Sequence, residues 1–400
     1  MKELAIVFAT DMKYIRQTCV AIESILSSAA DDKVFHQLYI LMPSAEVDAA
    51  QLYFENIQKR YRSCAVQCIG IGDALDNAYI RMDHITIPTY YRLLLPELVE
   101  RDKCIYLDSD IIVCQDLSEL YETDMEGYEA GGVLAPAYVR RKGYAERIGI
   151  PDTDGYINAG VLLLNLVQMR QDQFTRKALA LVEQPFPAQD QDIINRVAFH
   201  KIKKLPYKYN VQVARKRYLD MLPDEEREEA EKNPVILHYS SSEKPWECMD
   251  IDYAGRWWKV CRRTDFFQSL IDEQRDSMLY HSIIKNYDLW KMKKYSPEWL
   301  EELKTFQKCY VYGAGKVGRR AVSYLKEKHV PITGILVSDL EGNDSCIDGV
   351  RVSAFTEDME KDVLILVAVS EELQIQIRRK LFHAGLFYVM PFYELYYGLC

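Results

Sequence analysis

One short segment constrains the fold more than any other, because it places two carboxylates directly after an apolar strand. Residues 103–113 read KCIYLDSDIIV, with Asp108 and Asp110 separated by a single serine. An uninterrupted apolar run is typical of a strand covered on both faces, as in a parallel sheet flanked by helices. The two aspartates would then emerge at the sheet edge where ligands bind, and their oxygens favour Mg²⁺ or Mn²⁺. The alternative for such a pair is an inert helix cap or loop.

The start of the chain alternates between strand and helix patterns. Apolar runs at 4–10, 34–42 and 64–71 predict strands, and the segments between them predict helices over 14–27 and 45–60. The segment TYYRLLLPELV at 89–99 also predicts a helix. This alternation predicts an α/β fold with a mostly parallel, nucleotide-binding sheet.

Composition excludes several classes of protein. A chain of 400 residues is long enough for two domains, and its formal net charge of −10 argues against a nucleic-acid-binding protein. No apolar run reaches the roughly 20 residues that span a bilayer, and the start of the chain lacks the pattern of a cleavable signal, so a cytoplasmic protein is expected.

Ten cysteines without paired spacing predict reduced, mostly buried thiols and not a zinc site. The acidic run at 223–232 predicts a solvated helix or loop.

Four other segments accompany the Asp-x-Asp motif. They are IVFATDMKY at 6–14, HITIPTYYRLLLPEL at 84–98, YINAGVLLLNL with QDQDIINRV within 156–197, and HYSSSEKPW at 238–246. Together the five motifs resemble the retaining glycosyltransferases of family 8, which include bacterial lipopolysaccharide and lipooligosaccharide galactosyl- and glucosyltransferases and glycogenin. The resemblance covers roughly residues 1–265, and its specificity lies in the combination and order of the motifs.

The resemblance implies a GT-A type domain over 1–265 and a metal-dependent enzyme that moves a hexose from a UDP-sugar with retention of configuration. It implies a glycan or lipid-linked glycan as acceptor, in surface polysaccharide or lipopolysaccharide biosynthesis. The donor is expected to be UDP-galactose or UDP-glucose, and the sequence does not choose between them. Pro136 stands where related galactosyltransferases carry an aspartate near the acceptor, so the acceptor is expected to differ from a lactose-like end.

The resemblance also implies roles for individual residues. Asp108, Asp110 and His238 are implied as ligands of Mn²⁺, with Mg²⁺ as the alternative, because an imidazole nitrogen favours the softer ion. Asp190 is implied to grip hydroxyls of the donor sugar. Gln191 is implied on the reactive face of the anomeric carbon, where it positions and stabilises an oxocarbenium-like state without a covalent bond. The implied donor-binding residues are Ala9, Thr10, Asp11, Arg92, Asp108, Ser109, Asn158, Ser241 and Lys244.

Three of these assignments have a structural alternative. Asp11 either contacts the uracil base or caps a helix. Arg92 either holds the anionic oxygens of the donor or pairs with a structural carboxylate. His238 either binds the metal or plays a structural part at the end of its strand. The chain departs from the family pattern at Lys13, where relatives often carry asparagine, and at Ser241, where a glycine is expected.

Two basic stretches bear on partners. Residues 201–217 contain seven lysines and arginines and no acid, and residues 256–294 interleave basic residues with Trp257, Trp258 and other aromatic side chains. They predict peripheral contact with the anionic inner face of the plasma membrane, where a lipid-linked acceptor would lie. The alternative is an ordinary solvated face over core aromatics.

The end of the chain carries a glycine-rich pattern of its own. The run YVYGAGKVG supplies Gly313, Gly315 and Gly318 between a predicted strand and a predicted helix, and Asp339 follows the next strand. In dinucleotide sites such glycines admit a diphosphate and such an acid holds ribose, so these residues are a candidate second site for NAD or another nucleotide. A structural, regulatory or homo-oligomer-forming module is the other interpretation.

The predicted organisation is therefore a glycosyltransferase domain over 1–265, a helical connector over 266–306 and a Rossmann-like accessory domain over 307–400. Two other functions are alternatives to this one. An NAD-binding oxidoreductase would use the C-terminal glycines but would leave the five N-terminal motifs unexplained. A noncatalytic nucleotide-sugar-binding protein would need a broken metal site, whereas every expected ligand type is present in the sequence.

Overall fold

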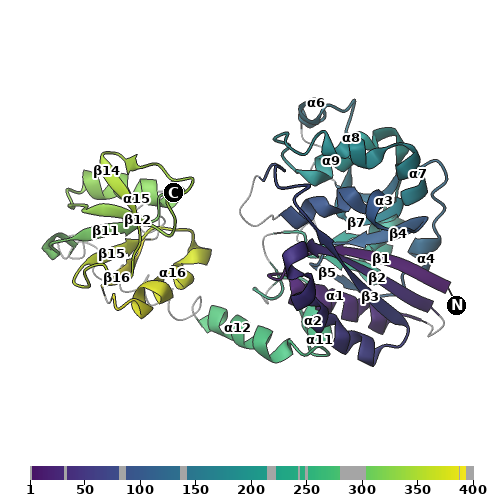
Figure 1. The fold of residues 1–400 in the computed structure, drawn as a ribbon, viewed down its shortest axis with the longest axis horizontal. Coiled ribbons are helices and arrows are strands. Elements are labelled where there is room, and N and C mark those ends of the chain that lie inside the picture. The colour runs from purple at the N-terminus through teal and green to yellow at the C-terminus, as the bar shows by residue number, and fades with distance from the viewer. Residues whose placement is uncertain are drawn as a thin grey trace. The chain divides into compact units, whose positions relative to one another are not determined.

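The structure is a computed structural model, and the chain forms two compact units, Met1–Gln274 and Arg275–Cys400 (Figure 1). We describe each unit by itself. The connector predicted over 266–306 is described in part, because helix α12 occupies Phe267–Leu279 and residues 280–302 lie outside the described residues. The described residues are 2–30, 34–80, 87–135, 142–213, 222–241, 244–247, 251–279, 303–386 and 388–392.

The first unit is built on a seven-stranded sheet. Its strand order is β3-β2-β1-β4-β7-β6-β8, and β7 runs antiparallel to both of its neighbours. The other neighbouring strands pair in parallel, which confirms the mostly parallel sheet predicted from the alternating pattern. The strands are β1 (Lys2–Ala9), β2 (Val34–Pro43), β3 (Cys64–Ile71), β4 (Lys103–Leu107), β6 (Ala130–Leu134), β7 (Ile157–Asn165) and β8 (Ile202–Lys204).

The side chains of β1 alternate between the two faces of this sheet. Leu4, Ile6 and Phe8 belong to one buried cluster, and Ala5 and Val7 belong to another. All five are at most 1% exposed. Because both faces are covered, the strand has no polar side, and its sequence reads as an unbroken apolar run.

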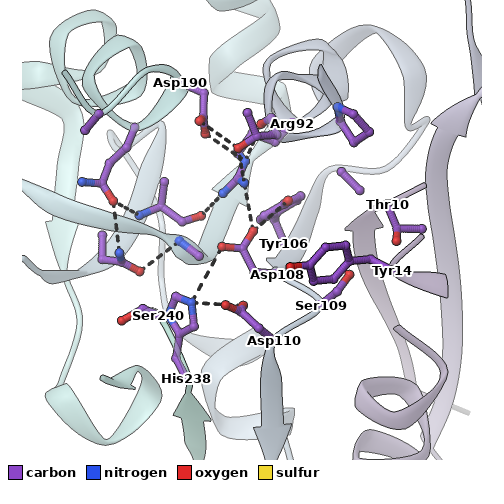
Figure 2. Close-up of a pocket in the computed structure, with 18 of the residues that line it drawn as sticks. Thr10, Tyr14, Arg92, Tyr106, Asp108, Ser109, Asp110, Asp190, His238 and Ser240 are labelled. Carbon is purple, nitrogen blue, oxygen red and sulfur yellow. Dashed lines mark hydrogen bonds and ion pairs between the residues drawn. The ribbon is translucent and has the colours of Figure 1, made fainter. Parts of the chain in front are cut away.

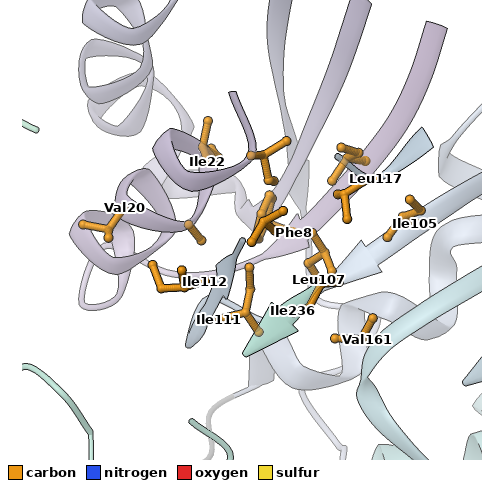
Figure 3. Packing of buried hydrophobic residues seen from close by; sticks show 14 of the residues in the cluster. Phe8, Val20, Ile22, Ile105, Leu107, Ile111, Ile112, Leu117, Val161 and Ile236 are labelled. Carbon is orange, nitrogen blue, oxygen red and sulfur yellow. The ribbon is translucent and has the colours of Figure 1, made fainter. Parts of the chain in front are cut away.

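Helices cover both faces of the sheet. On one face, Val20 and Ile22 of helix α1 share the buried cluster of Phe8 (Figure 3). On the other face, Ile193 and Ile194 of helix α9 share the second cluster. The described helices of this unit are α1 (Ile15–Ser28), α2 (Val47–Arg60), α3 (Leu95–Leu98), α4 (Ser118–Glu122), α6 (Tyr144–Ile148), α7 (Leu166–Gln171), α8 (Phe174–Leu179), α9 (Asp190–Val197), α10 (Asp224–Lys232), α11 (Ala254–Cys261) and α12 as far as Gln274. Short 3₁₀ helices lie at Ser44–Glu46, Ile87–Leu94, Phe199–Lys201 and Tyr207–Tyr209.

A second, three-stranded sheet follows the end of β4. Its order is β5-β10-β9, formed by Ile111–Val113, Ile236–His238 and Val211–Gln212. β10 pairs antiparallel with β5 and parallel with β9. Its apolar residues pack into the same cluster as the residues of β4, as Figure 3 shows for Ile111 and Ile236 beside Leu107. The chain therefore passes from one sheet to the other through the three residues Asp108 to Asp110.

One predicted helix has a different form. The segment TYYRLLLPELV, expected as helical, is a 3₁₀ helix over Ile87–Leu94 followed by the single α-turn of α3. Pro88 and Pro96 lack the N–H groups that a regular α-helix uses, which explains why no longer helix forms here. The acidic run at 223–232 forms α10, and only Ala230 of this helix is buried.

In its described residues, the second unit contains a six-stranded sheet and the long helices α15 and α16. The strand order is β13-β14-β12-β11-β15-β16, and all pairs are parallel except β13 with β14. This order and the helices after β11 and β15 agree with the predicted Rossmann-like arrangement. The elements are β11 (Cys309–Tyr312), α15 (Lys316–Glu327), β12 (Gly334–Val337), β13 (Cys346–Ile347), β14 (Val350–Ala354), β15 (Leu364–Val367), α16 (Glu371–His383) and β16 (Val389–Pro391).

The glycine-rich loop of this unit lies between β11 and α15. A Cβ on Gly318 would lie 2.0 Å from the carbonyl oxygen of Gly313, so the close packing of helix on loop requires glycine there. Gly313 itself has a φ of 120°. Gly315 has nothing within 4 Å of its Cβ position. Asp339 is exposed and follows β12 by two residues. No nucleotide contact is established by this arrangement, and the second site stays a prediction.

The described parts of the two basic stretches pack and pair within the first unit. Lys201 pairs with Asp172 at 2.5 Å, and Lys208 pairs with Glu229 at 2.9 Å. Trp257 is fully buried. These contacts favour the alternative of a solvated face over core aromatics. Residues 214–217 and 280–294 of the two stretches lie outside the described residues.

Two predictions from composition concern the whole chain. Among the described residues, no helix is both long enough and apolar enough to cross a membrane. Most of the described cysteines are buried free thiols, as expected, and Cys346 is exposed.

Candidate active site

Two strand ends bring the three predicted metal ligands together. β4 ends at Leu107, so Asp108 emerges from the seven-stranded sheet, and Asp110 leads into β5 of the three-stranded sheet. β10 pairs with β5 in a register that places His238 opposite Ile111. One ligand atom from each of the three side chains lies within 4.8 Å of the others (Figure 2).

Two features of this cluster fit a metal ion. Oδ1 of Asp110 is buried without a hydrogen bond and lies 3.3 Å from Nε2 of His238. Gly160 leaves the space beside the ligands open, because a Cβ there would lie 2.2 Å from Cε1 of His238 and 2.7 Å from Oδ2 of Asp108. Two carboxylates and one imidazole form a donor set suited to Mn²⁺. The residues therefore fit the predicted ion.

Lys244 lies against the same cluster. Its Nζ donates to Oδ2 of Asp110 at 2.6 Å and to the carbonyl oxygen of Tyr239 at 2.7 Å. Burial opposes ionisation of Asp110, but Lys244 holds its pKa well below the ordinary value. Burial also opposes the charge of Lys244, but pairing with Asp110 raises its pKa overall. At neutral pH the pair is therefore a carboxylate and an ammonium.

Arg92 joins the metal ligands to the predicted sugar site. Its guanidinium lies 2.9 Å from Asp108 and 3.1 Å from Asp190 (Figure 2). It also donates to the carbonyl oxygen of Ala159 and lies over the ring of Tyr106, 4.3 Å from the centroid. Burial works to lower the pKa of Arg92, but the two carboxylates raise it above its ordinary value. Arg92 is therefore paired with carboxylates, as one of its two interpretations predicted, and it also lines the pocket.

Asp190 opens helix α9, directly after a sharp turn of the chain. The turn is at Gln189, whose φ of 51° is rare for a residue with a side chain. Oδ1 of Asp190 accepts a hydrogen bond from Oγ1 of Thr89 at 2.9 Å. Burial raises the pKa of Asp190 to about 6, although Arg92 acts in the opposite direction.

Gln191 follows Asp190 and is held against β7. Its Oε1 accepts hydrogen bonds from Nδ2 of Asn158 and from the backbone N–H of Ala159, both at 3.1 Å. Its Nε2 donates to the hydroxyl of Tyr156 at 3.0 Å. Because β7 runs antiparallel to β4, its first residues reach the same sheet edge as Asp108, and this brings Asn158 and Gln191 to the metal ligands.

The end of β1 forms the opposite wall. Oγ1 of Thr18 donates to Oγ1 of Thr10 at 2.9 Å and lies 2.8 Å from Oγ of Ser109. Oδ1 of Asp11 accepts from the backbone N–H of Tyr14 at 3.1 Å, just before α1 begins. This contact closes the turn before α1, whose N-cap residue is Tyr14, and Asp11 also lines the pocket.

Most of these side chains line one pocket of about 610 Å³. The structure brings together every residue that the resemblance implied for donor, metal and catalysis in the first unit. Lys13 is exposed, and Pro136 lies outside the described residues. The predicted residues that line the pocket are Ala9, Thr10, Asp11, Arg92, Asp108, Ser109, Asp110, Asn158, Asp190, Gln191, His238, Ser241 and Lys244.

Several lining residues were not predicted. Tyr106 lies in an apolar strand and Thr89 beside a proline, and neither setting indicates a site residue. Gly160 follows Asn158 in the sequence Asn-Ala-Gly, and two small residues within a strand of large ones are a signal that could have identified it. Tyr14 and Ser240, which also line the pocket, lie within two of the five motifs, but no role was expected of either residue.

Comparison with known proteins agrees with this geometry. The family model described as "Glycosyl transferase family 8" matches residues 5–250, which is more than half of the chain. The chain belongs to glycosyltransferase family 8. The family 8 region includes all of the predicted metal, donor and catalytic residues, and it excludes the second unit.

Relatives and solved structures that resemble this family 8 protein are also glycosyltransferases. Glycosyltransferase GlyF of Streptococcus pneumoniae serotype 4 is 29% identical over 282 residues, which are 69% of this chain and 65% of GlyF. GlyE of the same organism is 29% identical over 272 residues, 64% of this chain and 60% of GlyE. The chain thus spans less than two thirds of either relative. The crystal structure of the galactosyltransferase LgtC with donor and acceptor sugar analogues is 26% identical, with a TM-score of 0.57 over 66% of this chain and 96% of LgtC. The first unit therefore has a GT-A type fold.

Proposed function

We propose that this family 8 glycosyltransferase moves a galactose or glucose residue from a UDP-sugar to a glycan or lipid-linked glycan, with retention of anomeric configuration. Formation of a surface polysaccharide is the proposed setting. The observation that carries the proposal is the position of Asp190 and Gln191, in one pocket with the cluster of Asp108, Asp110 and His238. A metal-binding end and a sugar-binding end then lie within reach of one nucleotide sugar.

The metal-binding end would hold Mn²⁺ through Asp108, Asp110 and His238. When bound, such an ion neutralises charge on a diphosphate leaving group. Lys244 adds a second positive charge on the side of Asp110. Ser109 and Ser241 also line the pocket with hydroxyl groups, and a hydroxyl at 241 can donate to a phosphate where a glycine is expected. We assign the uracil end to Ala9, Thr10 and Asp11, at the end of β1.

The sugar-binding end consists of Asp190, Asn158 and Gln191. The carboxylate of Asp190 can accept hydrogen bonds from sugar hydroxyls while Arg92 holds its orientation. Gln191 is an amide and a poor nucleophile, so we assign it to positioning and to electrostatic stabilisation of an oxocarbenium-like state. The departing UDP phosphate is the proposed base for the acceptor hydroxyl. Retention then follows from attack on the side of the leaving group.

The first test is release of UDP from a panel of UDP-sugars with Mn²⁺, with and without EDTA. We expect turnover of UDP-galactose or UDP-glucose that EDTA abolishes and that Mn²⁺ restores, because the diphosphate needs the ion. Asp110→Ala removes a ligand, and we expect loss of turnover. The assignment is wrong if wild-type protein turns over no donor in the presence of acceptor extracts, or if EDTA has no effect.

A second prediction concerns pH. Because the pKa of Asp190 is raised to about 6, its carboxylate gains a proton as the pH falls through that value. The protonated group loses its charge next to Arg92 and one acceptor for sugar hydroxyls. We expect kcat/KM at saturating metal to fall about tenfold for each pH unit below the pKa, and to be constant above it. Rates measured in overlapping buffers give this profile.

Thr89→Val provides the control for this assignment. The Thr89 hydroxyl donates to Asp190 and lowers its pKa, so its removal should move the acidic limb of the profile to higher pH. An acidic limb at the same pH in Thr89→Val would show that another group titrates.

A further inference from the structure

A continuous row of hydrogen bonds connects the metal ligand His238 to the reactive-face residue Gln191. Nδ1 of His238 lies 2.9 Å from Oδ1 of Asn210. Nδ2 of Asn210 donates to Oδ1 of Asn158 at 2.8 Å, and Nδ2 of Asn158 donates to Oε1 of Gln191 at 3.1 Å. Asn210 is fully buried, whereas its neighbours in the row line the pocket.

The backbone of β7 fixes which atoms donate and which accept in the first half of this row. The N–H of Gly160 donates to Oδ1 of Asn158 at 3.0 Å, and a backbone N–H can only donate. The atom of Asn158 that faces Asn210 is therefore an oxygen, so Asn210 must present its NH₂ group to it. The oxygen of Asn210 then faces His238, and Nδ1 of His238 must carry the hydrogen.

This tautomer leaves a lone pair on the other ring nitrogen. Nε2 of His238 lies 3.3 Å from Oδ1 of Asp110 and 3.8 Å from Oδ2 of Asp108. In a neutral imidazole with its hydrogen on Nδ1, these three atoms are all acceptors and converge on one point. Such convergence suits a cation, and a partner on the far ring nitrogen is the usual means of holding a ligating histidine in place.

The second half of the row is fixed in the same way. The N–H of Ala159 donates to Oε1 of Gln191 at 3.1 Å, so that atom is the carbonyl oxygen. The NH₂ group of Gln191 donates to Tyr156, whose hydroxyl in turn donates to Oδ1 of the buried Asp192 at 2.5 Å. The amide of Gln191 is therefore held by hydrogen bonds at both its oxygen and its nitrogen.

We propose that Asn210 is a positioning residue that couples the metal site to the reactive face. Its oxygen selects the tautomer of His238 that can bind a metal ion, and its NH₂ group holds Asn158, which in turn orients the amide of Gln191. The inference rests on the proposed function, because it assigns those three residues to metal, sugar and anomeric carbon. Asn210 acts through its neighbours and does not touch the donor.

The substitution Asn210→Asp tests separately the contact of Asn210 with His238 and its contact with Asn158. The substitution keeps an oxygen that accepts from Nδ1 of His238, but it removes the N–H groups that hold Asn158. We expect Mn²⁺ affinity in the presence of UDP to stay close to that of the wild type, and kcat at saturating Mn²⁺ to fall about 10- to 100-fold. Isothermal titration calorimetry with Mn²⁺ and UDP gives the first quantity, and UDP release gives the second.

Asn210→Ala removes both halves. We expect it to weaken Mn²⁺ binding about 10- to 100-fold in addition to lowering kcat. Asn165→Ala is the matched control, since Asn165 is an asparagine at the other end of β7 that caps α7 through the N–H of Gln168. It should lower the melting temperature and leave Mn²⁺ affinity and kcat unchanged.

The outcomes distinguish this inference from the proposed function. Asn210 variants with wild-type Mn²⁺ affinity and wild-type kcat would overturn the inference, whatever their melting temperatures. Equal losses of metal affinity in Asn210→Asp and Asn210→Ala would overturn the tautomer argument. If Asn210→Ala does not fold, Asn210→Asp alone tests the coupling through its split between affinity and kcat. If the wild type turns over no donor, the proposed function fails, and Mn²⁺ titration of the variants still tests the role of Asn210 toward His238.

Discussion

Gly160→Ala is expected to abolish metal binding and to reduce turnover by at least about 100-fold. The added Cβ would lie 2.2 Å from Cε1 of His238 and 2.7 Å from Oδ2 of Asp108, well inside contact distance. Neither neighbour can yield easily, because the His238 ring is buried and hydrogen-bonded and Asp108 pairs with Arg92. Calorimetric titration with Mn²⁺ and UDP, together with UDP release, measures both effects.

Gly155→Ala is the matched control. Gly155 lies just before β7, and nothing lies within 4 Å of its Cβ position. We expect this variant to bind metal and turn over donor as the wild type does. A Gly160→Ala enzyme with wild-type Mn²⁺ affinity would show that the ion, if any, lies elsewhere than among Asp108, Asp110 and His238.

Arg92→Met is expected to lower the free energy of unfolding by about 3–5 kcal/mol, because it leaves buried carboxylates without their cation. The side chains of Arg92 and Asp190 are only 6% and 7% exposed, so water cannot replace the lost partner. Loss of activity should accompany the loss of stability, since Asp108 and Asp190 both take their orientation from this guanidinium. Urea denaturation and donor turnover measure the two losses.

Two variants test the physical reason. Adding Asp190→Asn to Arg92→Met removes one of the unpaired charges, and we expect it to recover part of the stability but none of the activity. Lys59→Met breaks an exposed pair with Glu55, whose side chains are 70% and 47% exposed, and should change stability by less than about 1 kcal/mol. An Arg92→Met protein as stable as Lys59→Met would contradict a buried, charge-paired role for Arg92.

Local patterns predicted much of this molecule. The unbroken apolar runs before Asp108 and before His238 predicted that both residues would lie at strand ends, and the structure places them at one site. Alternation of strands and helices predicted the mostly parallel sheet, which the structure and the comparisons confirm. The roles of individual residues came from the resemblance to family 8 and not from periodicity, because an apolar pattern reports burial and not chemistry.

What could not be predicted depends on contacts between distant parts of the chain. An apolar run gives no sign of direction, so the reversed course of β7 was not foreseen, although it brings Asn158 and Gly160 to the site. Asn210 lies 52 residues from Asn158 along the chain, and nothing near either residue reveals that they pair. The 3₁₀ form of 87–94 was accessible in principle, since Pro88 and Pro96 both disfavour a regular helix.

The passage of the chain from one sheet to the other at residues 108–110 has a thermodynamic consequence. The backbone N–H of Asp108 is bonded to Gly160 of the seven-stranded sheet, and the carbonyl oxygen of Asp110 accepts from Tyr239, which follows the strand β10 of the three-stranded sheet. An ion held by both carboxylates would therefore link the two sheets. Ion binding and the packing of the three-stranded sheet on the seven-stranded sheet are then thermodynamically coupled. A change that weakens the packing of the sheets lowers the affinity for the ion, and loss of the ion weakens the packing by the same free energy.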